Sequence, residues 1–234
     1  MKDKKSAIIL CRGKSLEYLK ELSENKYDSC MIVNDFKREV NYIYVRKFLE
    51  KQKHLIHYVC REYFALLTKK IYEYFNIDFV YLNVLEKEYS GTPPYLRSSP
   101  IKEQLDRLGV KSKYLEKNIL KYSEPRDPSE LRLPGFPTMG VLTTCHVAAC
   151  MEYTDITVLG LDFYEAEYLT VCSSTLTKDA PKKSGIDKAP RMKNFLSEFL
   201  NKFSHINFTF YTYSTFNPDL RHVKIINKPL KEDL

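Results

Sequence analysis

Short apolar runs recur along the chain, and segments with helical spacing of apolar residues lie between them. Runs of this length, bounded by polar and glycine residues, are typical of strands that are buried on both faces of a sheet. Strands that alternate with helices predict parallel pairing through right-handed crossovers. We therefore expect an α/β fold with one doubly wound, mostly parallel, Rossmann-like sheet. The expected strands cover residues 6–10, 30–36, 54–60, 78–85, 155–163 and 207–214.

The segments between the expected strands include two that are less regular than the rest. Residues 86–134 contain repeated prolines, with one helix near residues 101–121, and we interpret them as a rim insertion. Residues 164–189 are polar and irregular, as in a lid-like loop. A chain of 234 residues suits one domain, so we expect residues 1–234 to fold as a single unit. The expected helices cover residues 16–22, 38–51, 62–75, 137–153 and 190–203.

The formal net charge is +7, from 37 Lys and Arg residues against 30 Asp and Glu residues. The basic residues are scattered and form no stripe of the kind that follows a nucleic-acid backbone, so we expect no nucleic-acid partner. The positive excess suits an anionic partner or an anionic lipid surface. Ordinary solubility is an equally good explanation.

The six cysteines include no C-x-x-C pair, which argues against the common zinc and redox motifs. Cysteines inside apolar runs behave as buried thiols and favour a reducing compartment. The apolar stretch near the N-terminus is too short for a signal peptide or a membrane span. We therefore expect a soluble, cytoplasmic protein that contacts the inner membrane peripherally.

Polar and glycine residues follow several of the expected strands directly. In an open parallel sheet the ligand lies beyond the carboxyl ends of the strands, where the strand order reverses. We therefore expect these residues to meet at one edge and to bind a nucleotide or a nucleotide-sugar there. The residues are Gly13, Ser15, Asn34, Asp35, Asp162 and Tyr164.

Two of the expected helices begin with residues that suit close approach of a ligand. Gly13-Lys14-Ser15 is not a P-loop, because that motif needs a second glycine where this chain has Ile8. A glycine turn that opens a helix still offers N–H groups to a phosphate or a carboxylate, and a plain tight turn is the alternative. Residues 138–140 also open a helix, either for a ligand or as a simple helix start.

Asp162 ends the most regular strand, where a carboxylate either accepts from ribose hydroxyls or caps a loop within the protein. His146 and Cys150 are four residues apart on one expected helix. They could share a metal, but core packing is the better interpretation of a helix that is apolar nearly all round. No D-x-D pair, which commonly holds a divalent cation and a nucleotide diphosphate, occurs in the sequence. We expect a metal-independent enzyme without a cofactor, or no enzyme at all.

Three blocks of the chain resemble the bacterial sialyltransferases of glycosyltransferase family 42. Residues 137–141 and 153–164 are similar to a family pattern that reads T-S-G-V, then a helix, then a strand ending in G-I-D-F-Y. Residues 9–16 resemble the family turn G-N-G-P-S-L, and residues 33–36 resemble a strand end that reads C-N-Q-F. The three blocks occur in the family order.

The resemblance implies one nucleotide-sugar-binding domain, a GT-A-like variant with a lid, that transfers an acidic sugar such as sialic acid from a CMP-sugar donor with inversion and without metal. The acceptor would be a glycan or a glycolipid, as in the biosynthesis of lipopolysaccharide and other cell-surface glycans. We also expect a homo-oligomer. The implied donor-binding residues are Gly13 and Ser15 near the phosphate, Asn34 at the nucleotide, Thr138 and Gly140 in the cytidine pocket, and Gly160 and Asp162 in the strand-end motif. Tyr164 and Tyr168 would hydrogen-bond the leaving phosphate.

The chain departs from the family at several positions. Arg12, Met139 and Cys60 stand where the family has asparagine, serine and asparagine. The catalytic histidine of the family lid has no counterpart in residues 165–204. Asp187, aligned near that place, and His222, near the C-terminus, are the two candidates for the general base, and a solvated surface residue is the alternative for each.

The missing histidine leaves other functions open. A related transferase with a CMP-Kdo-like donor or a nucleotide diphosphate sugar is one alternative. A non-catalytic nucleotide-sugar-binding protein is another. The position of the base distinguishes them, because an enzyme needs Asp187 or His222 near Tyr164.

Overall fold

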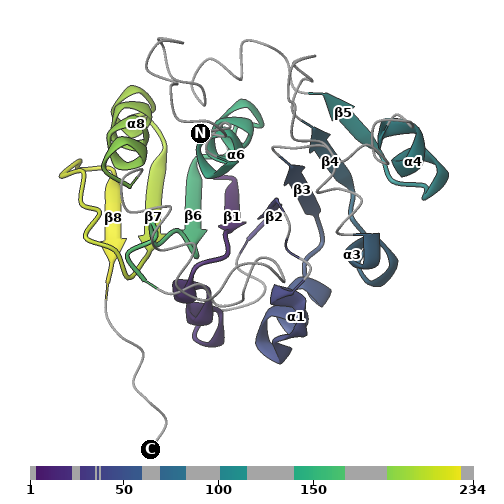
Figure 1. Cartoon of the computed structure of the whole chain (residues 1–234). Coiled ribbons are helices and arrows are strands. Elements are labelled where there is room, and N and C mark those ends of the chain that lie inside the picture. The colour runs from purple at the N-terminus through teal and green to yellow at the C-terminus, as the bar shows by residue number, and fades with distance from the viewer. Residues whose placement is uncertain are drawn as a thin grey trace, which may run out of the picture.

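The computed structural model describes residues 4–22, 27–34, 36, 38–59, 69–82, 101–114, 140–166 and 189–227. The strands of the described part are β1 (Ser6–Leu10), β2 (Ser29–Val33), β3 (Leu55–Val59), β4 (Phe79–Leu82), β5 (Ser112–Tyr114), β6 (Asp155–Leu159), β7 (Asn207–Tyr211) and β8 (Val223–Ile226). They form one eight-stranded sheet in the order β5-β4-β3-β2-β1-β6-β7-β8 (Figure 1). Every neighbouring pair is parallel, which confirms the predicted α/β fold with a doubly wound sheet.

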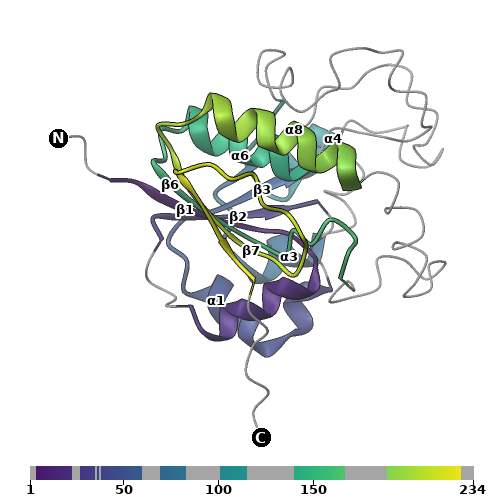
Figure 2. The same cartoon turned by 90° about the vertical axis from the view of Figure 1, so that its left-hand side faces the viewer.

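Helices cover both faces of the sheet. The helices of the described part are η1 (Lys14–Lys20), η2 (Glu39–Asn41), α1 (Ile43–Glu50), α3 (Lys69–Tyr74), α4 (Ile101–Arg107), α6 (Gly140–Cys150) and α8 (Ala189–Lys202), where η marks a 3-10 helix. Side chains of α6 and α8 share a core with one set of alternating strand residues, and η1, α1, α3 and α4 share a second core with the other set. Figure 2 shows α6 and α8 on one side of the sheet and α1 on the other.

The strand order reverses between β1 and β6. From β1 the chain adds strands in one direction as far as β5, and it returns through α6 to place β6 on the other side of β1. Leu10 pairs with Leu159, so the two strands end at the same level. Loops leave a doubly wound sheet on opposite sides at such a switch point, and this is where ligands bind in folds of this kind.

The two edge strands extend the sheet beyond the sequence prediction. Residues 101–114, within the predicted rim insertion, form α4 and β5, and β5 pairs with β4 at one edge. At the other edge β8 pairs with β7, where the sequence predicts no strand. Both edge strands are short and partly solvent-exposed, so neither shows the continuous apolar run of a central strand. Residues 167–188 of the predicted lid lie outside the described residues.

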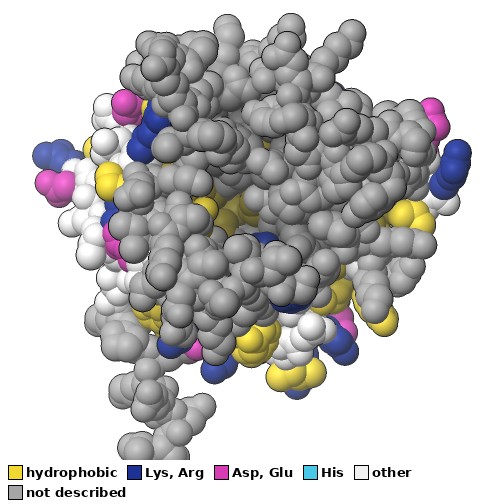
Figure 3. Space-filling model, in the orientation of Figure 1, with side chains coloured by type: hydrophobic (Ala, Val, Ile, Leu, Met, Phe, Trp, Pro, Cys, Tyr) yellow, Lys and Arg dark blue, Asp and Glu magenta, His cyan; other side chains and the backbone are white. Residues whose placement is uncertain are grey.

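The lengths of the described helices and the charges on the surface are evidence about membrane and nucleic-acid partners. None of the helices in the described ranges is long and apolar enough to cross a bilayer. Figure 3 shows described Lys and Arg side chains at separate places on this face, with Asp and Glu side chains beside some of them. On this face the coloured side chains form no continuous basic stripe, in keeping with the scattered charge of the sequence.

Candidate functional site

Two glycines bring the ends of β1 and β6 into direct backbone contact. The Gly13 N–H donates to the Gly160 carbonyl oxygen at 2.7 Å, and the Cys11 N–H donates to the Leu159 carbonyl oxygen at 2.7 Å. A Cβ on Gly160, whose φ is +74°, would lie 2.6 Å from the Cys11 carbonyl carbon and oxygen. A Cβ on Gly13 would lie 2.7 Å from the Gly160 carbonyl oxygen. Real Cβ atoms do not approach backbone atoms this closely, so the switch point requires glycine at both positions.

Asp162 is the centre of this switch point. Its buried carboxylate accepts from the Ser15 N–H at 2.9 Å and from the Tyr213 N–H at 2.9 Å. The Thr212 hydroxyl lies 3.2 Å from the same carboxylate. Three strand ends, those of β1, β6 and β7, are therefore joined through one side chain. Of the two interpretations of Asp162 from the sequence, the contacts correspond to capping within the protein.

Ser15 is hydrogen-bonded within the same arrangement. Its side chain is buried, its hydroxyl accepts from the Gly160 N–H at 3.1 Å, and its own N–H donates to Asp162. The N–H groups at the start of a helix bind anions readily, and here the Asp162 carboxylate occupies that position at the start of η1. The sequence allows a phosphate or a carboxylate as the partner of this turn, and in the structure the Ser15 N–H meets the carboxylate of Asp162.

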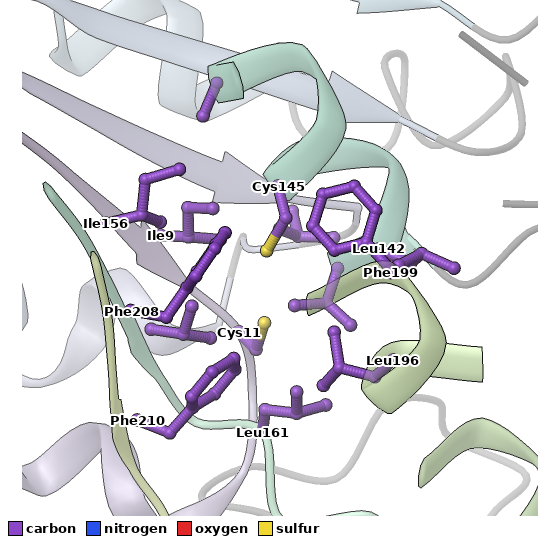
Figure 4. Packing of buried hydrophobic residues seen from close by; sticks show 14 of the residues in the cluster. Ile9, Cys11, Leu142, Cys145, Ile156, Leu161, Leu196, Phe199, Phe208 and Phe210 are labelled. Carbon is purple, nitrogen blue, oxygen red and sulfur yellow. The ribbon is translucent and has the colours of Figure 1, made fainter. Parts of the chain in front are cut away.

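The core beneath the switch point is apolar. Figure 4 shows Cys11 and Leu161, which flank the two turns, packed among side chains of α6, α8 and β7. Burial raises the pKa of the Cys11 thiol well above its usual value, and the nearby Cys145 and Asp162 raise it further. Cys11 therefore behaves as an inert packing residue rather than a nucleophile.

Tyr164 follows Asp162 in a strained turn. The Glu165 N–H donates to the Asp162 carbonyl oxygen at 2.8 Å, and the two residues between them, Phe163 and Tyr164, have φ of 48° and 64°. Turns with positive φ at both central residues are normally built from Gly, Asn or Asp. Two aromatic residues in this conformation cost about 1–3 kcal/mol each, and such strain clusters at functional sites.

Contacts on both sides of the turn hold this conformation. Phe163 is buried against Phe216, with ring centroids 5.0 Å apart. Glu165 accepts from the Thr215 N–H at 2.6 Å and from the Lys193 ammonium of α8. The same hydrogen bonds and the positive charge of Lys193 lower the pKa of Glu165, although partial burial opposes them. Tyr164 itself is half-buried at the carboxyl edge.

Asn34 directly follows β2 and meets the start of α6. Its N–H donates to the Tyr58 carbonyl oxygen at 2.7 Å, and its φ of 57° takes the chain out of the strand conformation. A Cβ on Gly140 would lie 2.9 Å from the Asn34 amide nitrogen and 2.9 Å from Val33 Cγ1. Two residues that the sequence assigns to the nucleotide site are therefore in contact, and glycine is needed at position 140 for that contact.

His57 of β3 lies beneath Asn34 and is fully buried. Its Nε2 lies 2.6 Å from the Asn34 carbonyl oxygen, and its Nδ1 lies 2.7 Å from the Tyr72 hydroxyl of α3. Burial lowers the pKa of His57 to about 4, although the hydrogen bond to Asn34 opposes the shift. Sequence reasoning missed His57; its one signal is a histidine within an apolar strand.

Arg12 and Glu39 form a second buried polar contact at this edge. The Arg12 Nε donates to the Glu39 carboxylate at 2.9 Å, and the Glu39 side chain is fully buried. Arg12 stands where the resembling family has asparagine. A guanidinium held by a buried carboxylate is an oriented group, because its planar fork fixes the direction of the remaining N–H donors.

His222 is a correction to the sequence prediction. Its backbone carbonyl accepts from the Phe208 N–H at the start of β7, and its Nε2 lies 2.9 Å from the Leu200 carbonyl oxygen. His222 directly precedes β8, so it lies at the amino edge of the parallel sheet, opposite Tyr164. The prediction of His222 as the general base is therefore wrong.

Several predicted residues cannot be placed. Thr138, Tyr168 and Asp187 lie outside the described residues, as do Asp35, Cys60 and Met139. His146 packs against the rings of Phe199 and Phe203, in agreement with a core role. The described ranges contain no group of three or more His, Cys, Asp and Glu side chains arranged to hold a metal ion.

Comparison with known proteins gives matches among solved structures. No family model and no curated protein matches the chain. The monofunctional α-2,3-sialyltransferase Cst-I from Campylobacter jejuni is 18% identical with a TM-score of 0.57, and the match covers 99% of this chain and 84% of Cst-I. The C. jejuni sialyltransferase CstII with cytidine-5'-monophosphate is 19% identical with a TM-score of 0.51, covering 89% and 80%. CST-II with a trisaccharide acceptor and CMP is 19% identical with a TM-score of 0.51, covering 97% and 89%. The chain thus shares, at low sequence identity, the fold of the Campylobacter sialyltransferases of glycosyltransferase family 42.

Proposed function

We propose that this chain is a glycosyltransferase that moves an acidic sugar from a CMP-sugar donor to a glycan or glycolipid acceptor. The observation that carries the proposal is the contact between Asn34 and Gly140 at the carboxyl edge of the sheet, beside the switch point. The fold supports it, because structures of CstII with this fold hold CMP or the analogue CMP-3FNeuAc.

The donor would bind on the side of the switch point formed by β2 and α6. The Asn34 amide presents both donor and acceptor groups, which suit a nucleotide. Gly140 permits the close approach of the Asn34 amide to the start of α6, as Gly13 permits the close approach of Gly160 to the turn after β1. Thr138 remains part of this proposal. Ser15, Gly160 and Asp162 would act by shaping the turn, since their polar groups contact one another.

Tyr164 and Tyr168 would stabilise the leaving phosphate. The departing CMP gains negative charge in the transition state, and fixed hydroxyl donors stabilise that charge without reorganisation. The strained turn supports this role for Tyr164. The contacts of Phe163 and Glu165 on either side fix the backbone from which the Tyr164 side chain projects.

Asp187 is the remaining candidate for the general base. A carboxylate suits removal of a proton from a sugar hydroxyl. With His222 at the opposite edge, a non-catalytic nucleotide-sugar-binding protein is the second candidate function, and the missing lid histidine favours it. The net charge of +7 suits an anionic donor, which is either a CMP-sialic acid or a CMP-Kdo-like sugar. Peripheral membrane contact and a homo-oligomeric state belong to the same proposal.

Turnover of a donor panel tests the proposal. We would measure nucleotide release from CMP-sialic acid, CMP-Kdo and UDP-sugars, with glycan acceptors, in EDTA and in Mg²⁺. We expect release of CMP from a CMP-sugar in EDTA, and a loss of about a hundredfold in Tyr164→Phe. Tyr74→Phe is the matched control, because Tyr74 is 73% exposed on α3. Turnover of UDP-sugars alone, or only with Mg²⁺, would contradict the proposal; CMP binding without turnover would favour the binding protein.

A further inference from the structure

We infer that His57 and Tyr72 are positioning residues that fix Asn34 for nucleotide binding. The inference rests on the proposed function, since it concerns nucleotide binding. It deepens that function by adding two residues that the predicted site does not include. Its basis is a chain of short contacts from Tyr72 on α3, through His57 on β3, to the backbone of Asn34 at the end of β2.

The direction of each hydrogen bond follows from the chemistry of the groups. A carbonyl oxygen can only accept, so His57 Nε2 carries a hydrogen and donates to Asn34. In a neutral imidazole the other nitrogen is then an acceptor, so the Tyr72 hydroxyl donates to Nδ1. The Asn34 carbonyl thereby sets the tautomer of His57, and the Tyr72 hydroxyl stabilises that tautomer by donating to Nδ1.

Both polar groups of the Asn34 backbone are held by residues of β3. Its N–H donates to Tyr58, and its carbonyl accepts from His57, both on β3. Its φ of 57° lies in the left-handed region, which asparagine tolerates better than most residues but does not prefer. The two hydrogen bonds therefore hold a conformation that the isolated residue rarely adopts, and this conformation directs the Asn34 amide toward Gly140.

A histidine with only a structural role would be energetically unfavourable at this buried position on β3. His57 and its neighbours on β3 are buried, where an apolar residue would need no hydrogen-bond partners. The hydrogen bond to the residue that would contact the nucleotide gives a reason for the polar side chain. The inference thus predicts that replacing His57 changes ligand affinity and not only stability.

Two substitutions at position 57 separate the donor to Asn34 from the rest of the side chain. His57→Gln extends an amide nitrogen to the region of Nε2 and can still donate to Asn34. His57→Asn is shorter, matches Nδ1 instead, and loses that donor. We would titrate CMP by calorimetry into the wild type, both variants and Tyr72→Phe. His146→Asn is the control, because His146 is also buried but packs against aromatic rings outside the site.

We expect His57→Asn to weaken CMP binding about tenfold and Tyr72→Phe about threefold, the scale of one lost hydrogen bond. His57→Gln should stay within about threefold of the wild type, and His146→Asn should bind CMP like the wild type even if it melts earlier. Equal affinities in His57→Asn and His57→Gln would overturn the positioning role. If His57→Asn does not fold, wild-type affinity in Tyr72→Phe overturns it instead. Failure of the wild type itself to bind CMP would overturn the proposed function, and the inference with it.

Discussion

The two flanks of the switch point use their polar residues differently. On the β6 flank, formed by Gly13, Ser15, Gly160 and Asp162, the polar groups contact one another and join three strand ends. On the β2 flank, formed by Asn34, His57 and Gly140, buried groups hold the backbone of a half-buried asparagine beside a helix start. The comparison indicates that the β6 flank builds the edge, whereas the β2 flank is where a nucleotide would be contacted.

The largest expected effect is on the stability of the β6 flank. Asp162→Ala removes the acceptor of one buried and one partly buried N–H group and should lower the free energy of unfolding by about 4 kcal/mol. Urea unfolding measures this. Asp155→Ala is the control, because Asp155 is half-buried at the amino edge and should cost about 1 kcal/mol or less. Equal losses in the two variants would contradict the central place of Asp162.

Mild acid should lower the free energy of unfolding chiefly through His57 on the β2 flank. The folded pKa of His57 is about 4, below the unfolded value of about 6.5, so the unfolded chain takes up the proton first. The stabilising contribution is therefore complete above about pH 6.5 and is lost as the pH falls toward 4, by about 3 kcal/mol in total. His57→Gln should remove this part of the pH dependence in urea unfolding measured across that range. An unchanged slope in the variant would contradict the buried neutral state of His57.

A pair of glycines with nearly equal φ isolates the close approach at the switch point. Gly160→Ala meets the Cys11 backbone at 2.6 Å, whereas Gly109→Ala, at φ +73°, meets nothing within 4 Å. Both variants pay the conformational cost of alanine in the left-handed region, about 1–2 kcal/mol. Gly160→Ala should lose about 2 kcal/mol more than Gly109→Ala in thermal unfolding, because backbone atoms must also move. Equal losses would mean that the ends of β1 and β6 are not held so tightly.

The substitution with the smallest expected change in the free energy of unfolding is the most informative about the ligand. Asn34→Gly removes the amide and leaves a residue that tolerates positive φ, so stability should change by less than about 1 kcal/mol. CMP affinity should nevertheless fall about tenfold in calorimetry. Asn41→Gly, at an exposed position, is the control. Wild-type affinity in Asn34→Gly would remove the β2 flank from the nucleotide site.

The sequence predicts the central strands because they are buried on both faces and read as apolar runs. It does not predict β5 or β8, which are short and partly exposed. The sequence offers His222 as a base only because it lies near the C-terminus. Since β8 begins at Val223 and runs parallel to β7, the chain returns to the amino edge before His222.

The sequence predicts which residues lie at the site better than it predicts what each of them does. The rule that polar residues meet beyond the carboxyl ends of parallel strands brings Asn34 close to Gly140, and Gly13 close to Gly160. Which partner a polar group finds depends on distances that the sequence does not contain. Asp162 thus finds N–H groups of the protein, and His57 reaches Asn34 because β2 and β3 pair in a register that aligns Val33 with Tyr58.

Hydrogen exchange with and without CMP, read by mass spectrometry, tests whether a nucleotide binds at the carboxyl edge of the sheet. We expect CMP to slow exchange in peptides containing Asn34 and Gly140, and to leave the peptide containing His222 unchanged. Slower exchange around His222 with none around Asn34 and Gly140 would contradict a nucleotide site at the carboxyl edge of the sheet.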